Sequence, residues 1–321
     1  MIPKHSTPTA TWLLLVAAAI AGLASTAAQA EDKMKPFILA STATGEVADQ
    51  LEGVKTALKA EGFEIVGDYA PYQSAHIIIV TNSDLKRAAS SHNRAGYVAG
   101  QRVAITKVGD EITHAGDQLQ VSYTNPLYMA AAYRIDTDLS SVAEALEAAL
   151  GAEVEFGPDE GLTADELAKY HYTFGMEYFD EPTHLASHEN YQEAIDIIEK
   201  NLEENLEGVS KVYRIDITGS KQTVFGVSMK ATGKVKNKYM DETYIMNEID
   251  FKPVRSTAHL PYEILVNGGE VEALHARFRI AMNFPDLSMM GSNSFMNIMP
   301  SPDAIKETLT LLAGGEIEEE I

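Results

Sequence analysis

Two stretches of similar pattern decide the fold: VGDEITHAGDQLQVSYTNP at 108–126 and NGGEVEALHARFRIAMNFP at 267–285. They have the same length, and when Pro126 is aligned with Pro285 their apolar residues fall at matched, alternating positions. Alternation with a period of two is typical of a strand with one buried face, and glycine-containing turns join such strands. The sequence therefore predicts equivalent β-hairpins at 103–126 and 262–285. The matched residues are Leu119, Val121 and Tyr123 in the first stretch, and Phe278, Ile280 and Met282 in the second.

The elements before and after these stretches also recur. Apolar residues spaced for one helical stripe predict a helix in each half, and Ser187 is the expected N-cap of the second. Each helix is followed by two extended segments and, later, by a closing helix at 138–150 or 301–312. The stripes are Val47, Leu51, Val54 and Leu58, and Tyr191, Ile195, Ile198 and Leu202; the extended segments are 63–69, 76–82, 211–217 and 223–229.

This order predicts an α+β fold of two similar modules, each a mainly antiparallel sheet packed with helices, which together form a pseudo-dimer. The expected boundaries are a first module at 31–156, a linker at 157–170 rich in Gly, Pro and acidic residues, a second module at 171–314 and an acidic tail at 315–321. The second module carries an extra segment, KATGKVKNKYMDETYIMNEID at 230–250, expected to form a longer hairpin or helix connection.

The same order of elements resembles the DUF302 family of small α+β domains. The resemblance covers about 35–150 and 171–312 and is carried by Gly62-Phe63, by SDLKRAAS at 83–90 and by AHLPYEILVNGGEV at 258–271. The cysteine often found after the proline of that motif is Tyr262 here. The resemblance implies a compact antiparallel-sheet domain that pairs with another copy, and it brings no established activity. Fusion of two such copies favours a monomeric pseudo-dimer with a ligand or partner site at the joint between them.

The N-terminus predicts export. Lys4 precedes the apolar run WLLLVAAAIAGL at 12–23, and Ala-Gln-Ala ends at Ala30 before Glu31. This pattern is typical of a signal peptide at 1–30, cleaved after Ala30, since the run is shorter than the roughly 20 apolar residues of a spanning helix. A periplasmic or secreted protein without membrane insertion after cleavage is expected.

Composition narrows the function further. The chain contains 47 acidic residues against 25 Lys and Arg, with a net charge of −22, which argues against nucleic acid as a partner. It contains no cysteine, so thiol chemistry and disulfides are excluded. Neither a nucleophile elbow nor a P-loop is present: GSNSF at 291–295 ends in Phe, and Gly233-Lys234 lacks the required spacing. We therefore expect a non-catalytic binding or accessory protein whose partner is a small ligand or an exported protein. The alternative is a hydrolase or isomerase that uses His and carboxylate residues in another arrangement.

Three groups of residues are candidates for a site. His184 and His188, four residues apart, would bind zinc or copper if their segment were helical, although surface histidines near a helix start are favoured. The methionines of MMGSNSFMNIMP, Met296 and Met299 among them, are of the kind that binds Cu(I), but a loop packed on the core is favoured. His259, His275 and Asn283 flank the second predicted hairpin and are candidates for ligand binding, with hydrogen-bonded structural roles as the alternative. No cofactor is identified by any motif.

Overall fold

The first half of the chain alternates strands and helices, within a computed structural model that describes residues 32–109 and 116–317. The stripe predicted from Val47 to Leu58 forms α1, and 83–90 forms a short helix capped by the side chain of Asn82. The elements are β1 (Phe37–Thr44), α1 (Val47–Ala60), β2 (Glu64–Tyr69), β3 (Ala75–Thr81), α2 (Ser83–Ala89), the 3-10 turn η1 (Ala95–Val98), β4 (Gln101–Val108), β5 (Gln118–Thr124), α3 (Pro126–Ala132), α4 (Ser140–Leu150), β6 (Val154–Phe156) and α5 (Ala164–Ala168).

The second half follows the same sequence of element types. The stripe from Tyr191 to Leu202 forms α6, but its N-cap is Asn190, whose side chain accepts two backbone N–H groups; the prediction of Ser187 as the cap was wrong, because Ser187 ends a strand. The elements are β7 (Thr183–Ser187), α6 (Tyr191–Glu203), η2 (Leu206–Gly208), β8 (Val209–Ile217), β9 (Gln222–Met229), η3 (Lys238–Met240), α7 (Glu242–Ile249), η4 (Thr257–His259), β10 (Tyr262–Asn267), β11 (Glu270–Ala273), α8 (Ala276–Asn283), η5 (Phe295–Ile298) and α9 (Ser301–Leu312).

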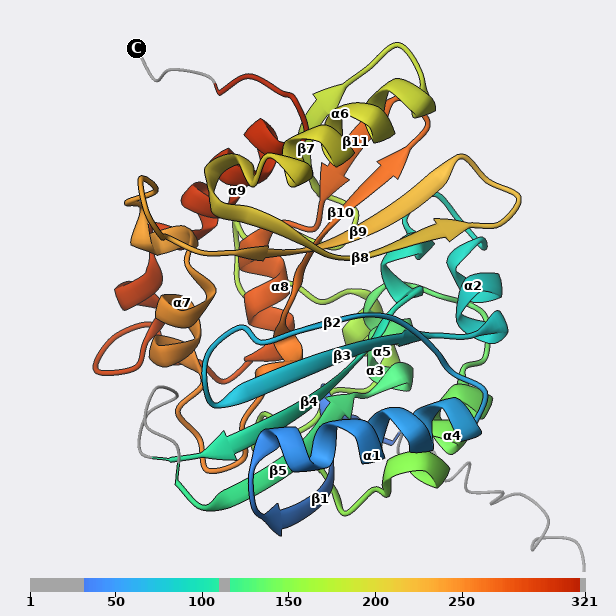
Figure 1. Cartoon of the computed structure of the whole chain (residues 1–321), viewed down its shortest axis with the longest axis vertical. Helices are drawn as coiled ribbons and strands as arrows, with labels where there is room; N and C mark the ends of the chain where they lie inside the picture. Colours follow the sequence, from blue (N-terminus) through green and yellow to red (C-terminus); the bar gives the residue numbers. More distant parts are fainter. Residues whose placement is uncertain (1–31, 110–115, 318–321) are drawn as a thin grey trace, which may run out of the picture. The chain divides into compact units, whose positions relative to one another are not determined.

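These strands form two antiparallel sheets, which establishes a mixed α+β fold. Among the described residues, one sheet has the order β2-β3-β4-β5-β1-β6 and the other the order β7-β11-β10-β9-β8. With β7 to β11 matched to β1 to β5, the second order is the first read backwards without β6. The helices follow the same correspondence, because α1 contacts α4 over the first sheet and α6 contacts α9 over the second. Figure 1 shows α6 lying along the five-stranded sheet and α1 along the other.

One of the two predicted hairpins is present and the other is shorter than expected. β4 pairs with β5 from Val103 to Val108, as predicted, although the turn at 110–115 lies outside the described residues. β10 pairs with β11 only from Leu265 to Asn267, and 276–283 is the helix α8 instead of a strand. The alignment of Pro126 with Pro285 was therefore wrong. α8 is buried almost all round, so its sequence has no polar face to reveal a helical period.

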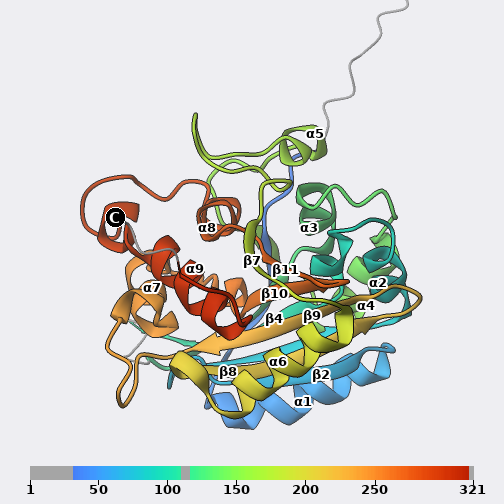
Figure 2. The same ribbon diagram turned by 90° about the horizontal axis from the view of Figure 1, so that it is seen from above.

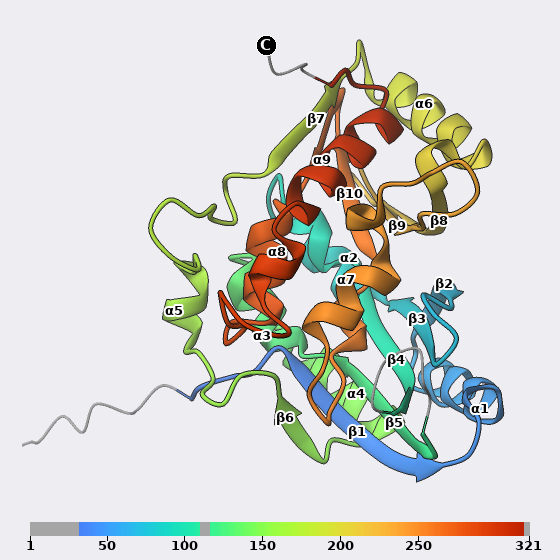
Figure 3. The same cartoon turned by 90° about the vertical axis from the view of Figure 1, so that its left-hand side faces the viewer.

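Helices α3 and α8 lie on the side opposite α1 and α6, as Figures 2 and 3 show. α3 begins at Pro126 behind the cap Asn125, and α8 begins behind His275. The connection from α5 to β7 runs along the side of α3 and α8 in Figure 3. The predicted linker at 157–170 is thus partly ordered, with α5 and a β-bridge between Met34 and Leu162.

Each half places one short turn on the sheet of the other. The 3-10 turn η1 precedes β4 and contacts β9 and β10, while η4 precedes β10 and contacts β3, β4 and β5. Gly96 shows how close the first contact is, because a Cβ there would lie 2.7 Å from Cδ1 of Leu265. We call this reciprocal packing the turn exchange. It joins the two sheets through segments that the sequence places just before equivalent strands.

The described residues contain no helix that is long and apolar enough to cross a membrane. The predicted signal peptide at 1–30 lies outside the described residues, and so do residues 318–321 of the predicted acidic tail.

Candidate functional site

A buried polar cluster joins the two sheets. Arg102 on β4 and Tyr213 on β8 both donate hydrogen bonds to the carboxylate of Glu263 on β10, and all three side chains are buried. Tyr213 reaches Glu263 across β9 because Gly226 has no side chain: a Cβ there would lie 1.9 Å from Cε1 of the Tyr213 ring. Burial, together with the negative charge of Glu263, raises the pKa of Tyr213 well above its ordinary value, so the phenol stays a donor.

The sequence candidates His259 and Asn283 lie together in this interior. The Asn283 amide is 2.7 Å from Nδ1 of His259, and Nε2 of His259 is 3.5 Å from the hydroxyl of Tyr262. Burial, reinforced by the positive charges of Arg279 and Arg102, lowers the pKa of His259 well below its ordinary value. His259 is therefore neutral near pH 7, with Nδ1 as the acceptor from the Asn283 NH2 group and the ring proton on Nε2.

The extra segment of the second half carries two buried carboxyls, those of Glu242 and Asp250. Burial raises the pKa of Asp250 to about 7, although the backbone N–H of Ser256 donates to its carboxyl at 2.8 Å. Burial also raises the pKa of Glu242 to about 8, despite the hydrogen bond that Tyr69 donates at 3.1 Å. The hydrogen bonds and positive charges around the two carboxyls do not offset the cost of burying their ionised forms. Both carboxyls therefore titrate near neutral pH.

The segment that carries Asp250 is attached to the first sheet. Gln120 on β5 donates to the carbonyl of Pro253 at 2.8 Å and accepts from the backbone N–H of Arg255 at 3.0 Å. Thr257 completes the attachment, since its hydroxyl is 2.9 Å from that of Thr106 and 3.0 Å from that of Tyr72. The segment 250–257 is therefore the part of the second half that lies at the joint.

A small hollow of about 20 Å³ opens beside this segment, and we call it the Asp250 hollow. Its wall combines the polar groups of Asp250 and Asn283 with apolar side chains, and Lys252 borders it while paired with Asp286. Asn283 is 1% exposed, and its Oδ1 has no hydrogen-bond partner among the described residues. An unpaired acceptor in the wall of a hollow is a site that a ligand N–H or an ordered water would satisfy. The full lining is Gly157, Ile249, Asp250, Phe251, Lys252, Ser256, Asn283, Phe284, Asp286 and Leu287.

The other sequence candidates do not join this hollow. Nδ1 of His275 accepts the backbone N–H of Arg277 as the cap of α8, and its Nε2 is 3.4 Å from Glu177. Met296 and Met299 are 49% and 55% exposed. Within the same loop, Met289 lines a separate small apolar hollow of about 20 Å³ with Phe284 and Phe295.

The two metal candidates have separate partners. His184 is in strand β7, 3.3 Å from the hydroxyl of Ser187, whereas His188 follows the strand and contacts the carbonyl of Ala313 at 2.8 Å. The helical spacing that a shared metal would require is absent, because 183–187 is extended. In the part of the chain that the structure describes, no group of three or more His, Asp or Glu side chains is arranged to hold a metal ion.

Sequence reasoning did not find Asp250, Glu242, Arg102 or Glu263. Each belongs to a residue type that is abundant in this acidic chain, so only spatial proximity distinguishes it. The Asp-x-Lys-Pro-x-Arg-Ser run at 250–256 was the available signal, because a proline-containing loop ahead of a strand often carries function.

Comparison with known proteins identifies no relative: no protein-family model matches the chain, and neither a curated protein nor a solved structure is detectably similar to it.

Proposed function

We propose that this chain is an exported, non-catalytic binding protein that holds a small amphiphilic ligand in the Asp250 hollow. The observation that carries the proposal is that Asn283, a buried side chain whose Oδ1 has no partner among the described residues, lines a hollow that also contains a buried carboxyl. Apolar walls with a few converging polar groups are typical of small-molecule sites.

The polar groups define the class of ligand. Oδ1 of Asn283 needs a donor, and Asp250 offers carboxyl oxygens in the same wall, so a ligand with N–H groups, an amine or an amide, fits. Phe251 and Phe284 would contact an apolar body attached to that group. Asp286 is already neutralised by Lys252, which leaves the Asp250 and Asn283 side as the polar end.

Internal duplication is part of the proposal. The shared sheet order, the matching helix pairs and the turn exchange support two DUF302-like modules fused into a pseudo-dimer, and the signal-like residues 1–30 support export to the periplasm or medium. A monomer in sedimentation equilibrium and a mature N-terminus at Glu31 are the expected results. A stable homodimer, or an uncleaved N-terminus in the exported protein, would contradict these two parts respectively.

The binding test uses benzylamine and N-methylbenzamide as probes in isothermal titration. Asn283→Leu is expected to weaken binding by about tenfold, the effect of one lost buried hydrogen bond. Asn201→Leu is the control, because Asn201 on the remote helix α6 is a part-buried amide that likewise donates a hydrogen bond, to the backbone carbonyl of Leu312. Native mass spectrometry of the purified protein would detect a ligand retained from the cell. If neither probe binds and no small molecule is retained, the proposal fails.

An acid–base enzyme is the second candidate function. It is favoured by Asp250, whose pKa of about 7 suits a general acid or base at neutral pH. His259 does not line the hollow, so of the expected His and carboxylate pair only the carboxylate is in the wall of the hollow. Turnover of a panel of nitrophenyl esters that Asp250→Asn abolishes would replace the binding proposal with this one.

A further inference from the structure

A further hollow, lined by other residues than the Asp250 hollow, lies between the two halves of the chain. It measures about 840 Å³ including its open mouth and is lined by His92, Asn93, Arg94, Arg134, Phe179 and Asp180. The first four precede the linker and the last two follow it. Two arginines therefore converge on one hollow in a chain with a net charge of −22.

Arg94 keeps most of its hydrogen-bonding capacity for a ligand. Its recorded side-chain contact among the described residues uses Nε alone, which donates to Glu272 at 2.8 Å. The backbone of Glu272 is also held, because Tyr97 donates to its carbonyl at 3.2 Å. The guanidinium of Arg94 is thus held through Nε, and its two terminal nitrogens have no partner among the described residues. This arrangement suits a bidentate hydrogen bond to an oxyanion.

Arg134 lines the hollow and has an unfavourable backbone conformation. It follows α3 with a φ of 54°, in the left-handed region where helix ends favour glycine. The bonds from Ile135 N to Ala130 O and from Arg134 N to Ala131 O close the end of the helix in the manner of a Schellman motif. Glycine would meet this backbone requirement without strain, so the arginine is explained by its side chain and not by the fold.

The side chain of Arg134 is positioned but not fully used. Nε donates to the carbonyl of Ala168 at 2.9 Å, and the guanidinium lies 6.0 Å from the centre of the Phe179 ring. Nη2 donates to Asp180 at 2.9 Å, and Asp180 is 55% exposed. Exposed ion pairs contribute little stability, so an incoming oxyanion can take the place of the Asp180 carboxylate.

His92 supplies a further unpaired group at the wall. Its Nδ1 accepts the backbone N–H of Arg94 at 3.2 Å, which leaves the proton of a neutral ring on Nε2. Nε2 is buried and has no partner among the described residues. A buried donor without a partner is one that a bound oxygen or an ordered water would satisfy.

We propose that this hollow binds a small organic oxyanion, a carboxylate or a phosphate, with Arg94 and Arg134 as its two forked donors and Phe179 in contact with its apolar part. The Asp180 carboxylate takes the position at Arg134 that the anion would occupy. The proposal is independent of the ligand of the Asp250 hollow, because the two hollows share no lining residue.

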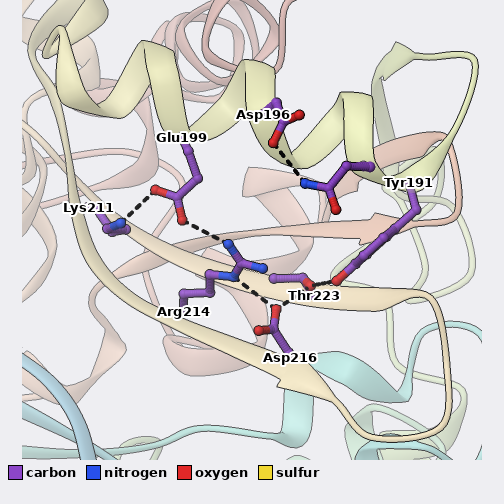
Figure 4. A network of polar contacts seen from close by, with 8 residues as sticks. Tyr191, Asp196, Glu199, Lys211, Arg214, Asp216 and Thr223 are labelled. Carbon is purple, nitrogen blue, oxygen red and sulfur yellow. Dashed lines mark hydrogen bonds and ion pairs between the residues drawn. The ribbon is translucent and has the colours of Figure 1, made fainter.

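Titration calorimetry with benzoate, phenyl phosphate and inorganic phosphate tests it, in a chloride-balanced Bis-Tris buffer free of other oxyanions. Arg94→Gln and Arg134→Gly are each expected to weaken binding by about tenfold, while Arg134→Gly folds normally because glycine suits its backbone. Arg214→Gln is the matched control: Arg214 is as exposed as Arg94 and paired with Glu199 and Asp216 on the outer face of the second sheet, as Figure 4 shows.

Asp180→Asn supplies an outcome that misfolding cannot imitate. Removal of the competing carboxylate is expected to tighten binding of the best probe by about threefold or more. Comparison of benzoate with inorganic phosphate separates a carboxylate site from a free-phosphate site. The proposal is overturned if no probe binds saturably, if Arg214→Gln weakens binding as much as the two site variants, or if Asp180→Asn leaves the affinity unchanged or lower.

Discussion

Arg102 of the first sheet donates a hydrogen bond to Glu263 of the second, across 161 positions of sequence, and both side chains are only 2% exposed. The pair is therefore a buried connection between the halves, and its contribution depends on both members. A buried charge that loses its partner is far more costly than an exposed one.

The first prediction concerns this pair. Arg102→Met is expected to lower the free energy of unfolding by about 3–5 kcal/mol, because it leaves Glu263 charged and unpaired in the interior. The double variant Arg102→Met with Glu263→Gln should recover a good part of that loss. Urea unfolding measures both. Arg214→Gln, which breaks a partly exposed pair, should cost less than about 1 kcal/mol; an equal loss in Arg102→Met would refute the interpretation.

The second prediction tests the space over Gly226. Gly226→Ala should destabilise the protein by about 1–3 kcal/mol, because its methyl group overlaps the Tyr213 ring and displaces the phenol from Glu263. Gly53→Ala is the control with the opposite sign. Gly53 lies exposed within α1 with nothing near its missing Cβ, so alanine should stabilise by about 0.5–1 kcal/mol. Thermal unfolding of both variants checks the pair, and a neutral Gly226→Ala would contradict the packing argument.

The third prediction is a pH dependence. Glu242 has a pKa of about 8 and Asp250 a pKa of about 7 in the folded chain, above their ordinary values of 4.5 and 3.8. Between these limits the folded state holds protons that the unfolded state has lost, so both groups make stability fall as pH rises toward 8. Glu242→Gln should remove its share, the larger one above pH 5.5, because the Glu242 window extends to about 8 and the Asp250 window to about 7.

Urea unfolding at pH 5.5 and 8.5 gives the measurement for wild type and Glu242→Gln. Other titrating groups, His259 among them, are common to both proteins and cancel in the comparison. An identical change in stability for the two proteins would show that Glu242 does not titrate in this range.

The fourth prediction follows the neutral His259. Asn283→Asp places a carboxylate against Nδ1, which is an acceptor in the wild type, and should therefore raise the pKa of His259. The Cε1–Hε1 signal of His259 in a ¹H–¹³C spectrum should be constant from pH 6 to 8 in the wild type and titrate or report the charged ring in the variant. Matching titration curves would place the two side chains apart in solution.

Local patterns in the sequence were sufficient for several elements of the fold. The stripe at Val47–Leu58 became α1 and that at Tyr191–Leu202 became α6, because each has one buried and one exposed face. The alternating residues of the first predicted hairpin became the paired strands β4 and β5, which are buried along most of their length. α8 was missed because its residues are nearly all buried, so the alternation of Phe278, Ile280 and Met282 imitated a strand.

The candidate site was less accessible to the same reasoning. His259 and Asn283 were identified as residues flanking a strand, and their mutual contact depends on a helix that the sequence concealed. Arg94 and Arg134 have no motif around them, and their convergence depends on how α3 ends and where the segment after the linker passes. Only Arg134 carried a physical anomaly, an arginine at a helix end that favours glycine, and its backbone angle is visible only in three dimensions.

The turn exchange bears on how the chain reaches its native state after synthesis. The first half leaves the ribosome with Gly96 and its neighbours facing nothing, because the strands that cover them, β9 and β10, are made more than a hundred residues later. The first sheet likewise lacks η4 until the second half is nearly finished. Neither half can form these contacts alone, so the packing of each sheet is completed only when the last third of the chain is available.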